Sequence, residues 1–120
     1  MYNSKDYKWF KIAETVEELQ FPATGLIELE VNEKKLCLSF YKDQVFACIA
    51  RCPHAGGALT EGYLDVMGNI TCPLHRYKFG PQNGRNVSGE GYFLKIFPVE
   101  MRNEGIFVGF KENSLLNWLK

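Results

Sequence analysis

The chain has 120 residues and a mass of 13.8 kDa, with 14 basic and 14 acidic residues and a formal net charge of +0. This length suits one domain with a single core. The balanced charge provides no field that would collect a polyanion, so nucleic acid is not an expected partner. The first residues lack the apolar stretch of a signal peptide, and the longest apolar run is far too short to cross a membrane. We therefore expect a soluble, cytoplasmic protein without a membrane span.

The first half of the chain has the pattern of an antiparallel meander. Apolar and polar residues alternate over 26–31 and over 36–40, and 44–49 forms a third candidate strand. Alternation with period two is typical of strands with one buried face. Asn32 to Lys35 and the pair Lys42-Asp43 are the predicted turns. Before the meander, Thr15 to Glu18 can form a capping box for a short helix.

Strands also dominate the second half, but the middle of the chain is different. We predict strands over 92–101 and 106–110, joined by a turn that ends at Gly105. Between Cys52 and Gly91 the chain is rich in Gly, Pro, Asn and Asp, with short strand-like pieces at 70–72 and 77–79. Long irregular segments inside a compact domain usually serve a function. A bound cofactor would explain this one.

Two cysteine–histidine pairs lie in this loop-rich middle. Cys52-Pro53-His54 is followed, after seventeen residues, by Cys72-Pro73-Leu74-His75, and these are the two histidines of the chain. Ordinary surface histidines and core thiols would rarely form two such pairs on Pro- and Gly-rich loops, so metal binding is the stronger interpretation. Zinc is a candidate, because two thiolates and two imidazoles suit a tetrahedral site. However, zinc sites usually pair cysteine with cysteine and histidine with histidine along the chain.

The order and spacing of these four residues resemble the motif of the Rieske family, which is C-x-H, some fifteen to seventeen residues, and C-x-x-H. The glycines at 56, 57 and 62 and Leu59 fit the first loop of that motif, and Pro73-Leu74 fits the second. The resemblance implies a [2Fe-2S] cluster held by two cysteines and two histidines: Cys52 and Cys72 on the inner iron, His54 and His75 on the outer iron. It also implies an all-β Rieske fold, with an antiparallel β-sandwich base and an inserted cluster-binding subdomain.

Several residues depart from the high-potential members of that family. Gly57 and Leu74 stand where those members carry a disulfide, and Tyr77 and Phe79 stand where they carry a serine and a tyrosine that donate hydrogen bonds to the cluster. Such hydrogen bonds raise the reduction potential. We therefore expect a potential in the lower part of the Rieske range, which spans roughly −150 to +300 mV.

Other residues around the motif have more ordinary interpretations. Arg51 and Arg76 are expected to be solvated surface charges, with attraction of an acidic partner as the sharper alternative. The segment 88–91 lacks the proline of the family's third loop. Cys37 and Cys48 are expected to be buried free thiols. The apolar end of the chain, with a helix cap at Ser114, is expected to pack on its own domain rather than dock a partner.

The resemblance implies a one-electron carrier between a reductase and a terminal oxygenase or other oxidoreductase, not an enzyme. An alternative is a small electron-transfer subunit of a larger redox enzyme, and a redox sensor or zinc-stabilised interaction module ranks below both. An oxygenase in its own right needs two further histidines and a carboxylate for a second iron. We expect one domain over 1–120, with a base of 1–47 and 83–110, a cluster-binding insert of 48–82 and a tail of 111–120.

Overall fold

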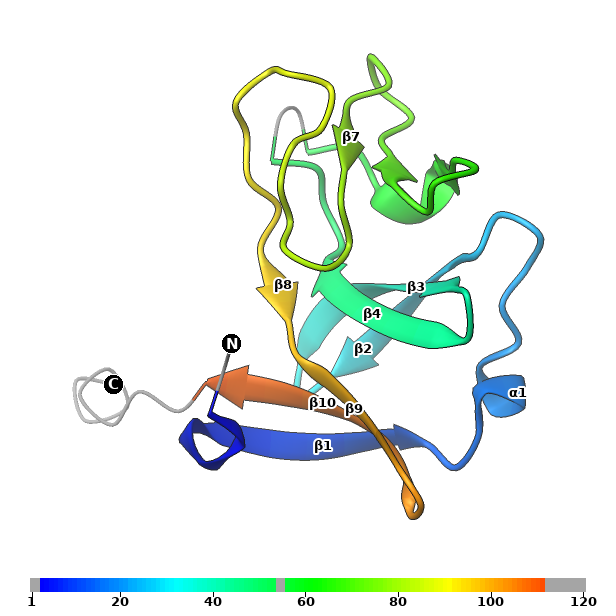
Figure 1. Cartoon of the computed structure of the whole chain (residues 1–120), viewed down its shortest axis with the longest axis vertical. Helices are drawn as coiled ribbons and strands as arrows, with labels where there is room; N and C mark the ends of the chain where they lie inside the picture. The colour runs from blue at the N-terminus through cyan, green and yellow to red at the C-terminus, as the bar shows by residue number, and fades with distance from the viewer. Residues whose placement is uncertain (1–2, 54–55, 112–120) are drawn as a thin grey trace.

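The computed structural model describes residues 3–53 and 56–111 and shows an all-β protein (Figure 1). Helical structure in these ranges is limited to single turns, α1 (Val16–Leu19), η1 (Ser4–Asp6) and η2 (Leu59–Glu61). The strands are β1 (Tyr7–Ala13), β2 (Leu26–Val31), β3 (Lys34–Tyr41), β4 (Gln44–Ile49), β5 (Tyr63–Leu64), β6 (Ile70–Thr71), β7 (Lys78–Phe79), β8 (Ile96–Phe97), β9 (Val99–Arg102) and β10 (Gly105–Lys111). They form three antiparallel sheets, of order β1-β10-β9, β2-β3-β4-β8 and β5-β6-β7.

The predicted meander is confirmed as β2, β3 and β4. Strand β2 runs antiparallel to β3 with Val31 opposite Lys34, and β3 pairs with β4 with Tyr41 opposite Gln44. The first turn is shorter than expected: it consists of Asn32-Glu33 alone, with φ of 50° and 66°. Two residues with positive φ match the twist of a hairpin, so the two lysines that follow already belong to β3. The turn Lys42-Asp43 has the same geometry and was correctly predicted.

The single strand expected over 92–101 is wrong. The chain forms β8 at 96–97 and β9 at 99–102, and Pro98 lies between them. Proline has no N–H to donate to a ladder, so it divides the run. Strand β8 joins the meander beside β4, whereas β9 joins β10 in another sheet. The turn after β9 is confirmed, with Gly105 opposite Arg102.

The two larger sheets enclose a core between them. Its buried residues come from both sheets and include Leu36, Leu38, Ala47, Val108 and Phe110. Strand β1 closes this base by pairing with β10. The short helix α1 begins with the capping box predicted at Thr15, where the Thr15 N–H donates to Glu18 Oε1 at 3.2 Å. The sandwich base predicted from the sequence is therefore present.

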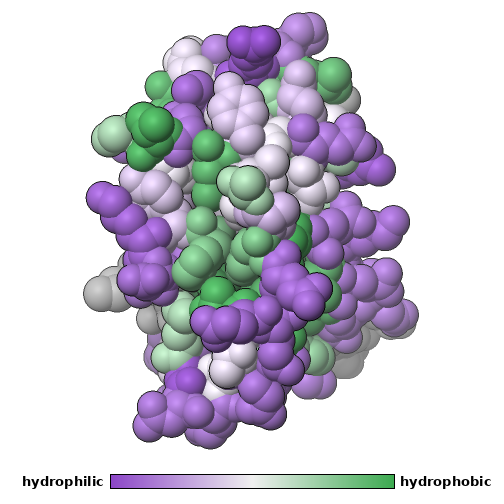
Figure 2. Space-filling view, turned by 90° about the vertical axis from the view of Figure 1, so that its right-hand side faces the viewer, coloured by the Kyte–Doolittle hydropathy of each residue, from purple (hydrophilic) through white to green (hydrophobic). Residues whose placement is uncertain are grey.

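The third sheet, β5-β6-β7, has its own core at one end of the molecule (Figure 1). This second core contains all four cysteines of the chain together with Leu59, Ile70, Phe79 and Leu94. Figure 2 shows hydrophobic side chains gathered across the middle of one face, with hydrophilic side chains below them and along both sides. No helix within the described ranges is long and apolar enough to span a membrane. The helix expected after Ser114 lies outside the described residues.

Candidate metal centre

Two loops at the end of the molecule away from β1 and β10 carry the cysteine–histidine motif, and they close in the same way (Figure 1). In the first, the Cys52 N–H donates to the carbonyl oxygen of Gly57 at 2.8 Å. In the second, the Cys72 N–H donates to the carbonyl oxygen of Tyr77 at 2.8 Å. Each loop therefore starts at a cysteine and is pinned five residues later. The cysteines lie at the bases of the loops, where the backbone is fixed.

The two cysteines meet inside the second core. Cys52 is 2% exposed and Cys72 is 0% exposed, and the two thiols lie close enough for Cys52 to raise the pKa of Cys72. The loops touch above them, because a Cβ placed on Gly57 would lie 2.9 Å from Leu74 Cδ1 and 3.7 Å from Cys72 Sγ. A side chain at position 57 would press against Leu74, and glycine avoids this contact while leaving the position beside the sulfur unfilled.

The Cys72 thiol is held in its protonated form when no metal is present. Burial raises its pKa to about 11, and the neighbouring Cys52 thiol adds to the shift, whereas the backbone N–H of Leu74 opposes it. A metal must displace this proton to bind the sulfur, so binding and proton release are linked. The Leu74 N–H is placed to donate to the thiolate that results.

His75 lies at the exposed tip of the second loop. It has φ of 62° and Arg76 has φ of 58°, so two consecutive residues adopt the left-handed conformation that turns the chain back toward β7. The His75 ring lies 6.4 Å from the Tyr77 ring, centroid to centroid. His54, the fourth predicted ligand, lies outside the described residues. Within the described ranges no three Cys, His, Asp or Glu side chains gather as a metal site, so the four-residue set stays a prediction.

The arginines flanking the motif differ from each other. Arg51 is exposed, but its Nη1 donates to the carbonyl oxygen of Gly56 at 3.1 Å, so it also braces the first loop. Arg76 is exposed at the tip of the second loop beside His75. Sequence reasoning treated both as solvated charges. The loop contact of Arg51 has no signal in the sequence, because it depends on how the first loop folds back.

A third segment, 86–92, lies at the same end of the molecule (Figure 1). Its residue Tyr92 packs on Tyr77, with ring centroids 5.7 Å apart and planes inclined at 36°. Phe79 is fully buried in the second core. Its side chain has no hydrogen-bond donor, as expected at this position. Sequence reasoning placed a loop here but missed Tyr92 as a neighbour of the second cysteine loop.

Cys37 and Cys48 are confirmed as buried thiols, at 0% and 1% exposure. They stand opposite each other on β3 and β4. The hydrogen bond with the Cys37 thiol, together with burial, raises the pKa of Cys48 well above its ordinary value. Both lie on strands outside the two cysteine–histidine loops, where buried thiols pack as small apolar side chains. These two cysteines act as core residues.

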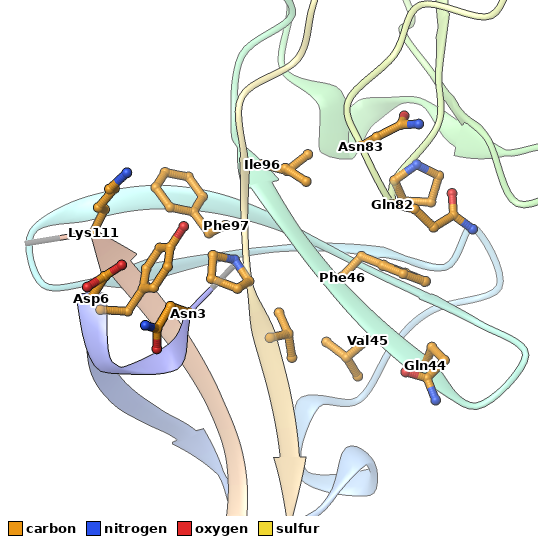
Figure 3. Close-up of a pocket in the computed structure, with 14 residues that line it drawn as sticks. Asn3, Asp6, Gln44, Val45, Phe46, Gln82, Asn83, Ile96, Phe97 and Lys111 are labelled. Carbon is orange, nitrogen blue, oxygen red and sulfur yellow. The ribbon is translucent and has the colours of Figure 1, made fainter. Parts of the chain in front are cut away.

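A groove of about 780 Å³ (Figure 3) has no lining residue from the two cysteine loops. Its floor is apolar and comes from β4, β8 and β9, with Phe46, Ile96 and Phe97 among the lining residues. Asp6 and Lys111 are the charged groups at its edge. A second groove of about 510 Å³ is lined by Phe21 and Phe40. Neither groove is lined by a cysteine or a histidine.

The fold and the loops together define a small β protein with a buried pair of thiols at one end. The family model described as "Rieske [2Fe-2S] domain" matches residues 8–94. The 3-phenylpropionate/cinnamic acid dioxygenase ferredoxin subunit of Photorhabdus laumondii is 31% identical over 101 residues, which cover 83% of this chain and 93% of that protein. The chain belongs to the Rieske [2Fe-2S] domain family.

Solved structures agree with this family. The complex of reduced oxygenase and oxidized ferredoxin in carbazole 1,9a-dioxygenase contains a chain with a TM-score of 0.70 and 25% identity, covering 88% of this chain and 95% of that one. A putative NADH-dependent nitrite reductase small subunit from Mycobacterium tuberculosis has a TM-score of 0.74 at 16% identity, covering 89% and 98% of the two chains. At that identity the second likeness shows the fold alone.

The residues present fit the cluster that the family description names. Soft thiolate ligands suit iron–sulfur clusters, and histidines replace two of them in Rieske centres. The structure supplies two buried thiols in contact, an exposed histidine on the same loop as one of them, and a glycine that leaves the space beside Cys72 Sγ open. The donor set and the room beside the sulfur are both appropriate to a [2Fe-2S] cluster.

Proposed function

We propose that this chain is a one-electron carrier whose Rieske [2Fe-2S] cluster is held by Cys52, His54, Cys72 and His75. The observation that carries the proposal is the arrangement of the second loop, which begins at a buried cysteine and ends at an exposed histidine. Such a cluster, when bound, accepts and returns one electron at a time. The cysteines would hold the inner iron away from water, and the histidines would hold the outer iron at the surface.

The exposed position of His75 supports electron exchange with another protein. An imidazole that binds iron and also reaches solvent brings the redox centre close to the surface, where a partner can approach. Leu74 beside it is 43% exposed, so the tip of the loop also has an apolar component. Small apolar contacts surrounded by polar groups are typical of transient interfaces. The tip of the second loop would be the place of electron transfer.

The similar proteins suggest the partners. One is a dioxygenase ferredoxin subunit, and another is a ferredoxin solved together with its oxygenase. We propose that this chain takes electrons from a reductase and passes them to a terminal oxygenase, in the cytoplasm. It would not be an oxygenase itself, because both of its histidines belong to the cluster motif and a second iron site needs two more.

The division of the chain follows from the same proposal. Residues 1–47 and 83–110 would form the base, 48–82 the cluster-binding insert and 111–120 a tail. The insert does not end sharply, since the Gly80 N–H donates to the Arg85 carbonyl at 2.8 Å and the Leu94 N–H donates to the Gly84 carbonyl at 2.8 Å. The segment before β8 therefore packs as part of the insert in space.

The reduction potential would lie in the lower part of the Rieske range of roughly −150 to +300 mV. Phe79 is buried and has no donor, and it occupies the position from which a tyrosine donates to the cluster in high-potential members. Voltammetry of the purified protein tests this directly. A potential near the upper limit would show that other donors reach the sulfurs.

Ligand substitutions with a matched cysteine control test the proposal. Cys72→Ser and His75→Ala should abolish the Rieske spectrum, whereas Cys48→Ser, in the same core but on β4 outside the two loops, should keep it. With the wild-type protein reduced beforehand, mixing with a terminal oxygenase should oxidise it by one electron per chain. Retention of the spectrum in Cys72→Ser, or a wild-type protein that oxygenases never oxidise, would contradict the proposal.

A further inference from the structure

The segment that packs beside the second cysteine loop is organised around one side chain, Asn86. Its Nδ2 group has two hydrogens to share among three acceptors, the carbonyl oxygen of Lys78 at 3.0 Å, Ser88 Oγ at 3.1 Å and Glu90 Oε1 at 3.0 Å. Its Oδ1 accepts from the backbone N–H groups of Glu90 and of Gly91, the latter at 2.9 Å. A single half-buried amide therefore holds both halves of this turn against β7.

The same turn is fixed to the backbone of β7 at a second place. The Val87 N–H donates to the Lys78 carbonyl at 2.9 Å, and the Lys78 N–H donates to Ser88 Oγ at 2.9 Å. Two glycines allow the sharp bend, since Gly89 has φ of 95° and Gly91 has φ of 86°. The position of the turn is thus set relative to the residue that directly follows Tyr77.

An aromatic contact leads from this turn to the proposed ligand. Tyr92 comes directly after the turn and packs on Tyr77 at 5.7 Å between ring centroids, and Tyr77 lies 6.4 Å from the His75 ring. Both separations are within the range of aromatic pairs, 4.5–7 Å. Asn86 therefore fixes the end of the turn from which the backbone enters Tyr92. The Tyr92 ring in turn restricts the movement of the Tyr77 ring and, through it, of the His75 ring.

We propose that Asn86 is a positioning residue for His75, acting through Tyr92 and Tyr77. This inference rests on the proposed function, in which His75 binds the outer iron. Hydrogen bonds at a partly exposed surface add little net stability, whereas groups that orient a metal-binding histidine change metal affinity by about 10- to 100-fold. The network is therefore expected to affect the cluster more than the fold.

Substitution of Asn86 tests this, with the neighbouring asparagine as control. Asn86→Ala removes all the hydrogen bonds of the Asn86 side chain. Asn86→Asp keeps the oxygen that accepts from the two backbone N–H groups but loses the amide N–H donors. Asn83→Ala is the matched control, because Asn83 Oδ1 accepts from the Arg85 N–H at 2.9 Å within the preceding turn. In the cluster-containing protein, both Asn86 variants should lose iron to a chelator about tenfold faster than wild type and change the paramagnetic spectrum of the reduced cluster. Asn83→Ala should do neither.

The route through the aromatic residues is tested by combining variants. Tyr92→Phe keeps the ring contact and should behave as wild type, whereas Tyr92→Ala should reproduce the effect of Asn86→Ala. Because both act along one route, the double variant should lose iron no faster than the more severe single variant. If the rate of iron loss in the Asn86→Ala/Tyr92→Ala variant were the product of the two single effects, Asn86 would not act through Tyr92. A Tyr92→Ala protein that loses iron at the wild-type rate would exclude this route as well.

The outcomes also separate this inference from the proposed function. A wild-type protein without a Rieske signal would overturn both. A normal wild-type signal, together with unchanged spectrum and iron loss in Asn86→Asp and Tyr92→Ala, would overturn the positioning role alone, even if the melting temperature falls. If Asn86→Ala does not fold, Asn86→Asp and Tyr92→Ala decide the question by the same two readouts.

Discussion

A disulfide can be introduced across the two cysteine loops at Gly57 and Leu74. A Cβ on Gly57 would lie 3.1 Å from Leu74 Cγ, the place that the sulfur of a cysteine at 74 would occupy. Across a disulfide bond the corresponding separation is roughly 3 Å. The double variant Gly57→Cys/Leu74→Cys should therefore form the bridge without movement of either backbone. The position of these two residues in high-potential relatives, inferred from sequence resemblance, is consistent with this contact.

The expected gain in stability follows from the length of chain that the bridge closes. A closed loop of roughly 18 residues reduces the entropy of the unfolded chain enough to stabilise the fold by about 3 kcal/mol. For a domain of this size that corresponds to a rise in melting temperature of about 10 °C. The rise should disappear on reduction. Mass spectrometry of the oxidised protein should show the loss of two hydrogens.

Moving one cysteine by a single residue provides the control. A Cβ on Gly56 would have no neighbour within 4 Å, so Gly56→Cys/Leu74→Cys should remain reduced under the same oxidant. Failure of the 57/74 pair to form the bridge would refute the contact between the loops. So would equal bridging in both double variants.

Three further substitutions test other parts of the structure. A Cβ on Gly62 would overlap the carbonyl oxygen of Thr71, which directly precedes the second loop. Gly62→Ala should therefore lower the free energy of unfolding by about 2 kcal/mol. An unchanged melting curve would contradict this. Burial alone would raise the pKa of Asp65, but the ion pair with Lys78 at 3.0 Å and nearby N–H donors hold it below its ordinary value. The advantage of wild type over Asp65→Asn, about 1 kcal/mol after solvent screening, should be present above about pH 4 and should shrink in thermal unfolding as the pH falls below that value. An advantage that stays constant down to about pH 2 would be inconsistent. Arg76→Glu should slow oxidation by the acceptor up to about tenfold at low salt, with the gap closing as salt rises, whereas equal rates at all salt concentrations would leave Arg76 without a role in docking.

Strands β2 and β4 could be predicted to the residue, because their signals are local, whereas β3 begins two residues earlier than expected. Strict alternation marks β2, an apolar run marks β4, and Lys42-Asp43 forms the expected turn. Strand β1 was not predicted, since Trp9 and Phe10 are adjacent and interrupt the alternation. Its position depends instead on pairing with β10, a partner about one hundred residues away in the chain. Non-local pairing of that kind leaves little trace in a short window of sequence.

The candidate site also has one part that the sequence predicts and another that only the structure shows. The cysteine and histidine positions are a motif that spacing alone reveals, and the contact between Gly57 and Leu74 agrees with the resemblance that the spacing suggested. The network around Asn86 has no comparable pattern. An asparagine in a glycine-rich segment reads as an ordinary turn residue, and its importance appears only when the segment lies against β7.

The most direct test of the account is the composition and spectrum of the purified wild-type protein. Two irons and two acid-labile sulfides per chain are expected, as the family description implies. The protein should be red-brown and give a rhombic paramagnetic signal when reduced by one electron. A colourless protein that contains one zinc per chain, and is silent before and after reduction, would contradict the central claim.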